Sequence, residues 1–166
     1  FAFEPVIDLL LAYKENTSVW NADLNIPESG DGIPDILNEV KYELDWLLKM
    51  QNSNGSVLSI VGVTNFAEAS PPSADNNPRR YGPATTSATF TASALFALGA
   101  IQFNSIGQTA YANTLQTASV NAYNWAVANP NITFYNSGSI GAGEQEVGSY
   151  EKFFRQMASA VFLYAL

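Results

Sequence analysis

The groups in this sequence that could do chemistry are carboxylates, because it contains no Cys and no His. Ser-His-Asp and Cys-His catalysis therefore cannot occur within the chain, and the commonest metal ligand is absent. Six carboxylates lie in expected loops, where we interpret them as solvated charges or caps: Asp23, Glu28, Asp31, Asp75, Glu144 and Glu146. Asp31 precedes an expected helix and fits a capping role. Carboxylate oxygens could bind calcium, but no EF-hand spacing is present, so we predict no metal site and no cofactor.

Composition bounds the protein class. The chain has 166 residues, of which 47% are hydrophobic, and a net charge of −8 with only seven Lys and Arg. This length suits one compact domain, and the missing basic footprint argues against nucleic-acid binding. No run of eighteen apolar residues occurs, so no membrane span is predicted. A surface rich in Asn, Ser and Thr is common in secreted proteins, and we expect secretion. Both ends of the sequence read as the interior of a domain, so we expect a fragment.

Hydrophobic periodicity predicts an all-α fold with long irregular connections. The expected helices cover 2–14, 33–51, 85–103, 109–129 and 150–166. Loops are expected at 15–32, 64–83 and 130–149, with a short strand or extended arm at 56–63. In the helix at 33–51, Pro34 suits the first turn, Asp35 and Glu39 lie near the positive end of the helix dipole, and Asn54-Gly55 follow as a stop signal. The helix at 85–103 is rich in small residues, which predicts an inner helix buried on most sides.

Two segments carry a family signature, and a third supports it. The first is Leu24-Asn-Ile-Pro-Glu-Ser-Gly-Asp-Gly-Ile-Pro-Asp-Ile-Leu-Asn-Glu39, followed by Trp46-Leu-Leu-Lys-Met-Gln51. The others are Arg80-Tyr-Gly-Pro-Ala-Thr-Thr-Ser-Ala-Thr89 and Phe134-Tyr-Asn-Ser137. Together they resemble glycoside hydrolase family 9, the cellulase and endoglucanase family. The resemblance covers nearly the whole chain and implies a partial (α/α)6 toroid, with 1–166 as a fragment of one catalytic domain.

The resemblance also implies a reaction, the hydrolysis of β-1,4-glucan with inversion. An inverting glycosidase needs one carboxyl group to protonate the leaving oxygen and another to activate water. In this family the base is an Asp in an upstream Asp-Ala-Gly-Asp-like segment and the acid is a Glu near the domain's C-terminal end. Neither segment is present, so we assign no catalytic residue and expect the chain alone to be inactive. It would supply scaffold and sugar-binding loops. The alternatives are a non-catalytic carbohydrate-binding scaffold and a helical interaction protein, although no repeat supports the latter.

Five residues are the candidates for contact with β-glucan or cello-oligosaccharides, because sugar clefts combine aromatic rings with polar neighbours. They are Arg79, Arg80 and Tyr81 at the end of one long loop, and Phe134 and Tyr135 in the other. In the family the first loop places an aromatic residue against a glucosyl unit. This chain has Pro78 where many members have His, and Gly138 where some have Trp. Tyr81 could also be an ordinary packed residue, and the two arginines could pair with Asp75 instead of sugar.

The three tryptophans are further candidates for stacking on sugar. Trp46 and Trp125 lie beside core positions on expected helices, so we expect core packing for both, while Trp20 lies in an expected loop and either role is open. Half a toroid would also leave apolar helix faces unpaired, and exposed apolar patches drive association. We therefore expect the isolated chain to be marginally stable or to self-associate.

Overall fold

The computed structural model describes residues 2–21, 23–64, 70–138, 140 and 149–166. The described part is mainly helical, with α1 (Phe3–Glu15), α2 (Thr17–Trp20), α3 (Asp35–Met50), α4 (Thr86–Ser105), α5 (Thr109–Ala128) and α6 (Ser149–Tyr164). A 3-10 turn, η1 (Pro72–Ala74), and a two-stranded antiparallel ribbon of β1 (Val61–Gly62) and β2 (Arg80–Tyr81) complete it. This confirms the all-α prediction and all five expected helices to within two residues at each end. The short helix α2 and strand β2 lie in stretches expected to be loops, so that part of the prediction was wrong.

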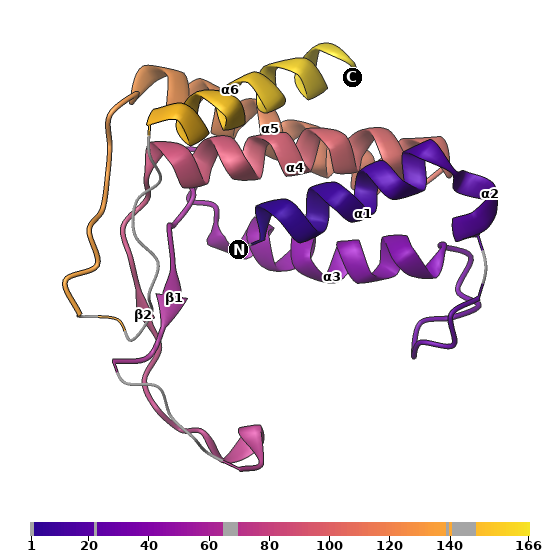
Figure 1. The fold of residues 1–166 in the computed structure, drawn as a ribbon, viewed down its shortest axis with the longest axis horizontal. Helices are drawn as coiled ribbons and strands as arrows, with labels where there is room; N and C mark the ends of the chain where they lie inside the picture. The colour runs from indigo at the N-terminus through magenta and orange to yellow at the C-terminus, as the bar shows by residue number, and fades with distance from the viewer. Residues whose placement is uncertain (1, 22, 65–69, 139, 141–148) are drawn as a thin grey trace.

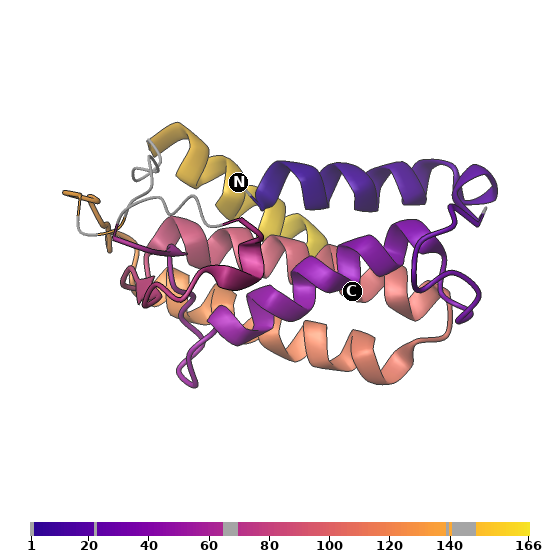
Figure 2. The same cartoon turned by 90° about the horizontal axis from the view of Figure 1, so that it is seen from below.

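The long helices form a layered body with α4 at its centre. Helix α4 contacts α1, α3, α5 and α6. Helices α1, α4 and α6 run in one direction, and α3 and α5 run in the opposite direction (Figures 1 and 2). The ribbon projects from the end of the body at which α1, α4 and α6 begin. The connections from α3 to α4 and from α5 to α6 therefore both lie at this end.

Small side chains explain why α4 can be buried on all sides. Ser93 Oγ donates to the Ser119 carbonyl (3.0 Å) and Ser119 Oγ donates back to the Ser93 carbonyl (2.6 Å), which joins α4 to α5 at close range. Gly99 lies against Leu44 and Leu115, where an added Cβ would come within 2.8 Å of a Leu44 methyl. By length and composition α4 could cross a membrane, but 83% of its apolar stretch is buried in this body, as in the core helix of a globular domain.

A polar cluster joins α3 to α5 beside this core. Tyr111 donates to Asp45 (2.8 Å), and Lys41 forms an ion pair with the same carboxylate (2.6 Å). The Lys41 ammonium also lies 4.6 Å from the centre of the Tyr111 ring, whose edge meets Phe103. Burial is the main cause that raises the pKa of Tyr111 far above its ordinary value, and the bond to Asp45 adds to it. The phenol is therefore a permanent hydrogen-bond donor.

The start of α3 differs in detail from the expectation. Pro34 lies just before the first helical residue, and no side chain caps the helix. Asp31 does not cap it either, because its carboxylate accepts from Ile33 N (2.8 Å) and the Asn38 amide (3.2 Å). Asp35 is buried and accepts from Leu24 N (2.6 Å) and Ser29 Oγ (2.5 Å). The Asp-rich segment thus folds the preceding loop onto the helix.

Helix α3 ends in a turn fixed against α5. Gln51 is the C-cap, and its side-chain amide donates to the carbonyls of Gly55 (3.1 Å) and Ala118 (2.9 Å). The expected stop at Asn54-Gly55 lies in the turn after the helix, where Gly55 has φ +93°. An added Cβ at Gly55 would lie 2.8 Å from the Asn121 carbonyl carbon, so glycine is required there for both conformation and space.

Helix α6 covers one side of α4 and leaves an apolar face open. Phe153, Met157, Val161 and Tyr164, which sequence periodicity placed on one face, are all exposed. This is the kind of unpaired helix face that we expected of a partial toroid.

Candidate functional site

The ribbon that carries Tyr81 is anchored to the helical body at its base. Ser59 N donates to the Pro83 carbonyl (3.1 Å) and Gly82 N to the Ile60 carbonyl (2.8 Å), which extends the pairing beyond β1 and β2. Val57 N donates to Thr89 Oγ1 on α4 (3.0 Å). The direction of the ribbon is therefore set by the first turn of α4.

The two faces of the ribbon are chemically different. Val61 pairs with Tyr81, and Gly62 pairs with Arg80. Because successive side chains of a strand point to opposite faces, Tyr81 shares the face of Val61, and Arg80 lies on the other face. Tyr81 is 63% exposed. The structure thus separates two neighbouring sugar-binding candidates, which cannot contact the same side of one sugar ring.

The two arginines have different partners. Arg79 pairs with Asp75 (3.0 Å) and donates to the Asn77 carbonyl (3.0 Å). Hydrogen bonds from Asn77, and to a smaller extent Arg79, hold the pKa of Asp75 below its ordinary value. Arg80 Nε donates to Thr64 Oγ1 (2.6 Å) across the ribbon. Arg79 is therefore committed to its own loop, as the alternative interpretation of the sequence allowed.

The second aromatic pair approaches the ribbon from the segment after α5. A Cβ at Gly82 would lie 3.2 Å from the Phe134 ring, so this ring packs directly on the β2 segment. A Cβ at Gly62 would likewise lie 2.8 Å from Ile140. Tyr135 is 73% exposed. The structure therefore brings together the loops that carry the five candidates, although these loops are about fifty residues apart in sequence.

Thr86 fastens this second segment to α4. Its backbone N donates to the Ile132 carbonyl (2.9 Å), its hydroxyl accepts from Ile132 N (2.9 Å), and the hydroxyl donates to the Asn129 carbonyl. Lys152 of α6 adds a bond to the Pro130 carbonyl (3.0 Å). The sequence did not predict this role of Thr86, because its partners Asn129 and Ile132 are more than forty residues away along the chain.

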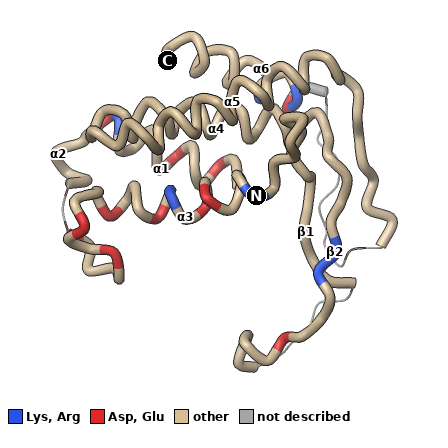
Figure 3. The backbone as a smooth tube through the Cα atoms, turned by 180° about the vertical axis from the view of Figure 1, so that it is seen from behind, with Lys and Arg blue, Asp and Glu red and all other residues tan. Residues whose placement is uncertain are grey.

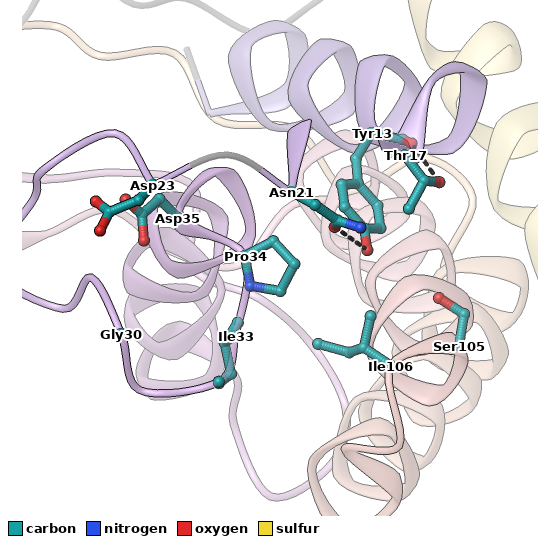
Figure 4. Close-up of a pocket in the computed structure, with 11 residues that line it drawn as sticks. Tyr13, Thr17, Asn21, Asp23, Gly30, Ile33, Pro34, Asp35, Ser105 and Ile106 are labelled. Atoms are coloured by element: carbon teal, nitrogen blue, oxygen red, sulfur yellow. Dashed lines mark hydrogen bonds between the residues drawn. The ribbon is translucent and has the colours of Figure 1, made fainter. Parts of the chain in front are cut away.

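Two hollows lie at opposite ends of the helical body. The larger, about 720 Å³, is formed where α1 and α4 end and α3 begins, with Tyr13, Asn21, Asp23 and Asp35 among its lining residues (Figure 4). Its polar groups bond to one another, as in the Tyr13–Asn21 contact (3.4 Å). The smaller, about 260 Å³, lies beside Val61 at the end that carries the ribbon. Of these two hollows, the smaller one lies nearer to the candidate sugar-contact residues, because Tyr81, Phe134 and Tyr135 are all at the ribbon end of the body.

The tryptophans occupy three different environments. Trp20 is half-buried and packs against the core, which settles the role left open by the sequence. Trp125 is half-buried on α5. Trp46 is 37% exposed and lines the smaller hollow, so the expected core packing was wrong for this residue. A helix position next to core residues does not reveal whether a neighbouring segment covers the ring.

Acidic residues concentrate on α1, α3 and the segment between them, whereas basic residues mark the ribbon at β2, which begins with Arg80 (Figure 3). Of the loop carboxylates, Asp23 accepts from Asn25 N (2.8 Å), Glu28 is exposed, and Glu144 and Glu146 lie outside the described residues. Among the residues that the structure describes, no group of three or more Asp or Glu is close enough to hold a metal ion.

Comparison with known proteins places this helical body and its ribbon in one family. The model of Glycosyl hydrolase family 9 matches residues 3–165. Endoglucanase D of Acetivibrio thermocellus is 34% identical over 123 residues, which are 73% of this chain and 20% of that protein. A cellodextrinase of Butyrivibrio fibrisolvens is 32% identical over 145 residues, which are 85% of this chain and 26% of that protein. The chain belongs to glycoside hydrolase family 9, as its signature segments indicated.

Solved structures agree with the fold. A metagenome-derived family 9 endoglucanase superposes with a TM-score of 0.85 at 30% identity, over 96% of this chain and 29% of that one. A thermostable endoglucanase from Alicyclobacillus acidocaldarius gives a TM-score of 0.87 at 25% identity, over 98% of this chain and 31% of that one. The helical body is therefore part of an (α/α)6 toroid, and the chain spans about a third or less of these relatives.

Proposed function

We propose that this chain supplies scaffold and sugar-binding loops to a secreted β-1,4-glucan hydrolase of the inverting type, and that its catalytic Asp and Glu lie outside residues 1–166. Membership of family 9 carries the proposal, and the exposed ring of Tyr81 on an anchored ribbon supports it. Tyr81 would stack on the apolar face of a glucosyl unit. Phe134 and Tyr135 would contact neighbouring units from the segment after α5. Arg80 would contact sugar from the opposite face of the ribbon, whereas Arg79 would hold the loop through Asp75.

The second candidate is a non-catalytic carbohydrate-binding scaffold, favoured by the same exposed aromatic residues. Two assays on the 166-residue chain test what the two candidates share: reducing-sugar release from amorphous cellulose, and binding of cellotetraose by calorimetry. The flanking coding sequence separates them, because an upstream Asp-Ala-Gly-Asp-like segment would support the hydrolase. Binding that weakens in Tyr81→Ala, with no sugar release, supports the proposed division of labour. Sugar release that survives re-purification would overturn it and make Asp75, Glu144 and Glu146 the first residues to mutate. Absence of binding would overturn the sugar-contact role of Tyr81.

A further inference from the structure

The turn that follows α3 contains a pair of residues that can react with each other. Asn54 precedes Gly55, and this is the only Asn-Gly pair in the sequence. In such a pair the glycine nitrogen can attack the side-chain carbonyl carbon of the asparagine, because no Cβ hinders its approach. Base removes the N–H proton, the new N–C bond closes a succinimide ring, and the Cγ–Nδ2 bond breaks as the leaving nitrogen takes up a proton and departs as ammonia. Water then opens the ring at either carbonyl, which gives aspartate or isoaspartate.

The closed turn occupies both reacting groups. Gly55 is buried and its N–H donates to the Asn52 carbonyl (2.9 Å), so base cannot remove the proton until this bond breaks. The Asn54 side chain is also held, because its Oδ1 accepts from Ser56 N (3.1 Å) and from Ser56 Oγ (2.8 Å). Ser56 is only 2% exposed, so these bonds attach the asparagine to a buried residue. Attack by the Gly55 nitrogen therefore requires the turn to open.

Few contacts hold the turn closed. The Gln51 side-chain amide donates to the carbonyls of Gly55 (3.1 Å) and Ala118 (2.9 Å), and residues 52–54 are exposed. Segments with exposed backbone and few apolar contacts open locally at a lower free energy than the whole fold. We propose that Asn54 is a site of self-modification: the closed turn protects it, and local opening lets the Gly55 nitrogen convert it irreversibly to aspartate or isoaspartate.

Isoaspartate does not fit the turn in which it forms. It adds one methylene to the backbone between positions 54 and 55. Gly55 cannot shift toward α5 to absorb the extra atom, because even an added Cβ would lie 2.8 Å from the Asn121 carbonyl carbon. Modification therefore loosens the fastening of α3 to α5. The ribbon starts only a few residues later, so its base is affected as well.

The test follows Asn54 in the 166-residue chain by peptide mapping and mass spectrometry during incubation in mildly alkaline buffer. Conversion should be about tenfold or more slower in the native chain than in guanidinium chloride above the unfolding midpoint. Gln51→Ala removes the bonds that fasten the turn and should speed native conversion at least about threefold. Gly107→Ala is the matched control: it lies in the connection from α4 to α5, so it destabilises the fold without touching the turn and should leave the native rate unchanged.

Slow native conversion that Gln51→Ala alone accelerates supports the inference. Equal rates in native buffer and in denaturant would show that the turn gives no protection, and would overturn it. Equal acceleration by Gln51→Ala and Gly107→Ala would show that conversion requires global unfolding, which also overturns it. Chain enriched in isoaspartate should unfold at lower urea, whereas Asn54→Asp keeps an acceptor for Ser56 and should unfold as the parent does; equal stability of all three would contradict the loosened turn.

Discussion

The turn at Gly55 allows a sharp test of how α3 is fastened to α5. Gly55 has φ +93°, a conformation that costs a residue with a Cβ about 1–2 kcal/mol. An alanine Cβ would also lie 2.8 Å from the carbonyl carbon of Asn121, and overpacking of this kind costs about 1–3 kcal/mol. Because the obstructing atoms are backbone, they cannot rotate away. We therefore expect Gly55→Ala to reduce the free energy of unfolding by about 2–5 kcal/mol.

Gly107 provides the matched control, since its φ is +80° but no described heavy atom lies within 4 Å of its added Cβ. Gly107→Ala should therefore cost only the conformational term of about 1–2 kcal/mol. The loss of unfolded-state entropy from Gly to Ala is the same at both sites and cancels in the comparison. Urea denaturation followed by circular dichroism measures both variants. Equal costs would refute the proposed clash with Asn121.

Three further predictions follow from contacts described above. Tyr111→Phe should lower the free energy of unfolding by about 1–2 kcal/mol, because it removes the donor to a charged Asp45, and urea denaturation measures this. The folded pKa of Asp75 is depressed, so its ion pair should persist above the ordinary Asp pKa and be lost as pH falls through the depressed value; NMR titration of Asp75 against Asp75→Asn measures this. The isolated chain should associate with increasing concentration, and Val161→Lys on α6 should favour the monomer in sedimentation; a parent chain that sediments as a clean monomer would contradict this.

Much of the fold was predictable because it depends on periodicity. The apolar stripe of α3 predicts which face of that helix is buried, and the small residues of α4 predict that it is buried on most sides. Neither prediction requires knowing which helices pack against them. The helix α2 was missed because four residues contain too little of a helical period. The pairing of β1 with β2 was missed because a strand of two residues has no measurable alternation, and its register depends on contacts across a gap of seventeen residues.

The candidate site was predictable only in part, because spatial contact between loops cannot be read from one loop. The sequence identified Tyr81 and Phe134 through family resemblance, and the structure brings their segments together. The sequence could not distinguish the roles of Arg79 and Arg80, because nothing in their order along the chain assigns a partner to either. The structure shows that Arg79 pairs with Asp75 and that Arg80 donates to Thr64. The prediction for Trp46 was wrong because the exposure of its own ring depends on how residues 57–61 fold back toward α3, and the sequence of α3 does not contain this information.

The opposed faces of the ribbon have an evolutionary consequence. A shift of the β1–β2 pairing by a single residue would exchange the side on which Tyr81 and Arg80 project, while every residue kept its identity. The bonds from Ser59 N to the Pro83 carbonyl and from Gly82 N to the Ile60 carbonyl fix this register at the base of the ribbon, so insertion or deletion of one codon in residues 63–79 should leave the two faces unchanged. The side on which Tyr81 projects is therefore protected against changes in loop length, which surface loops tolerate well.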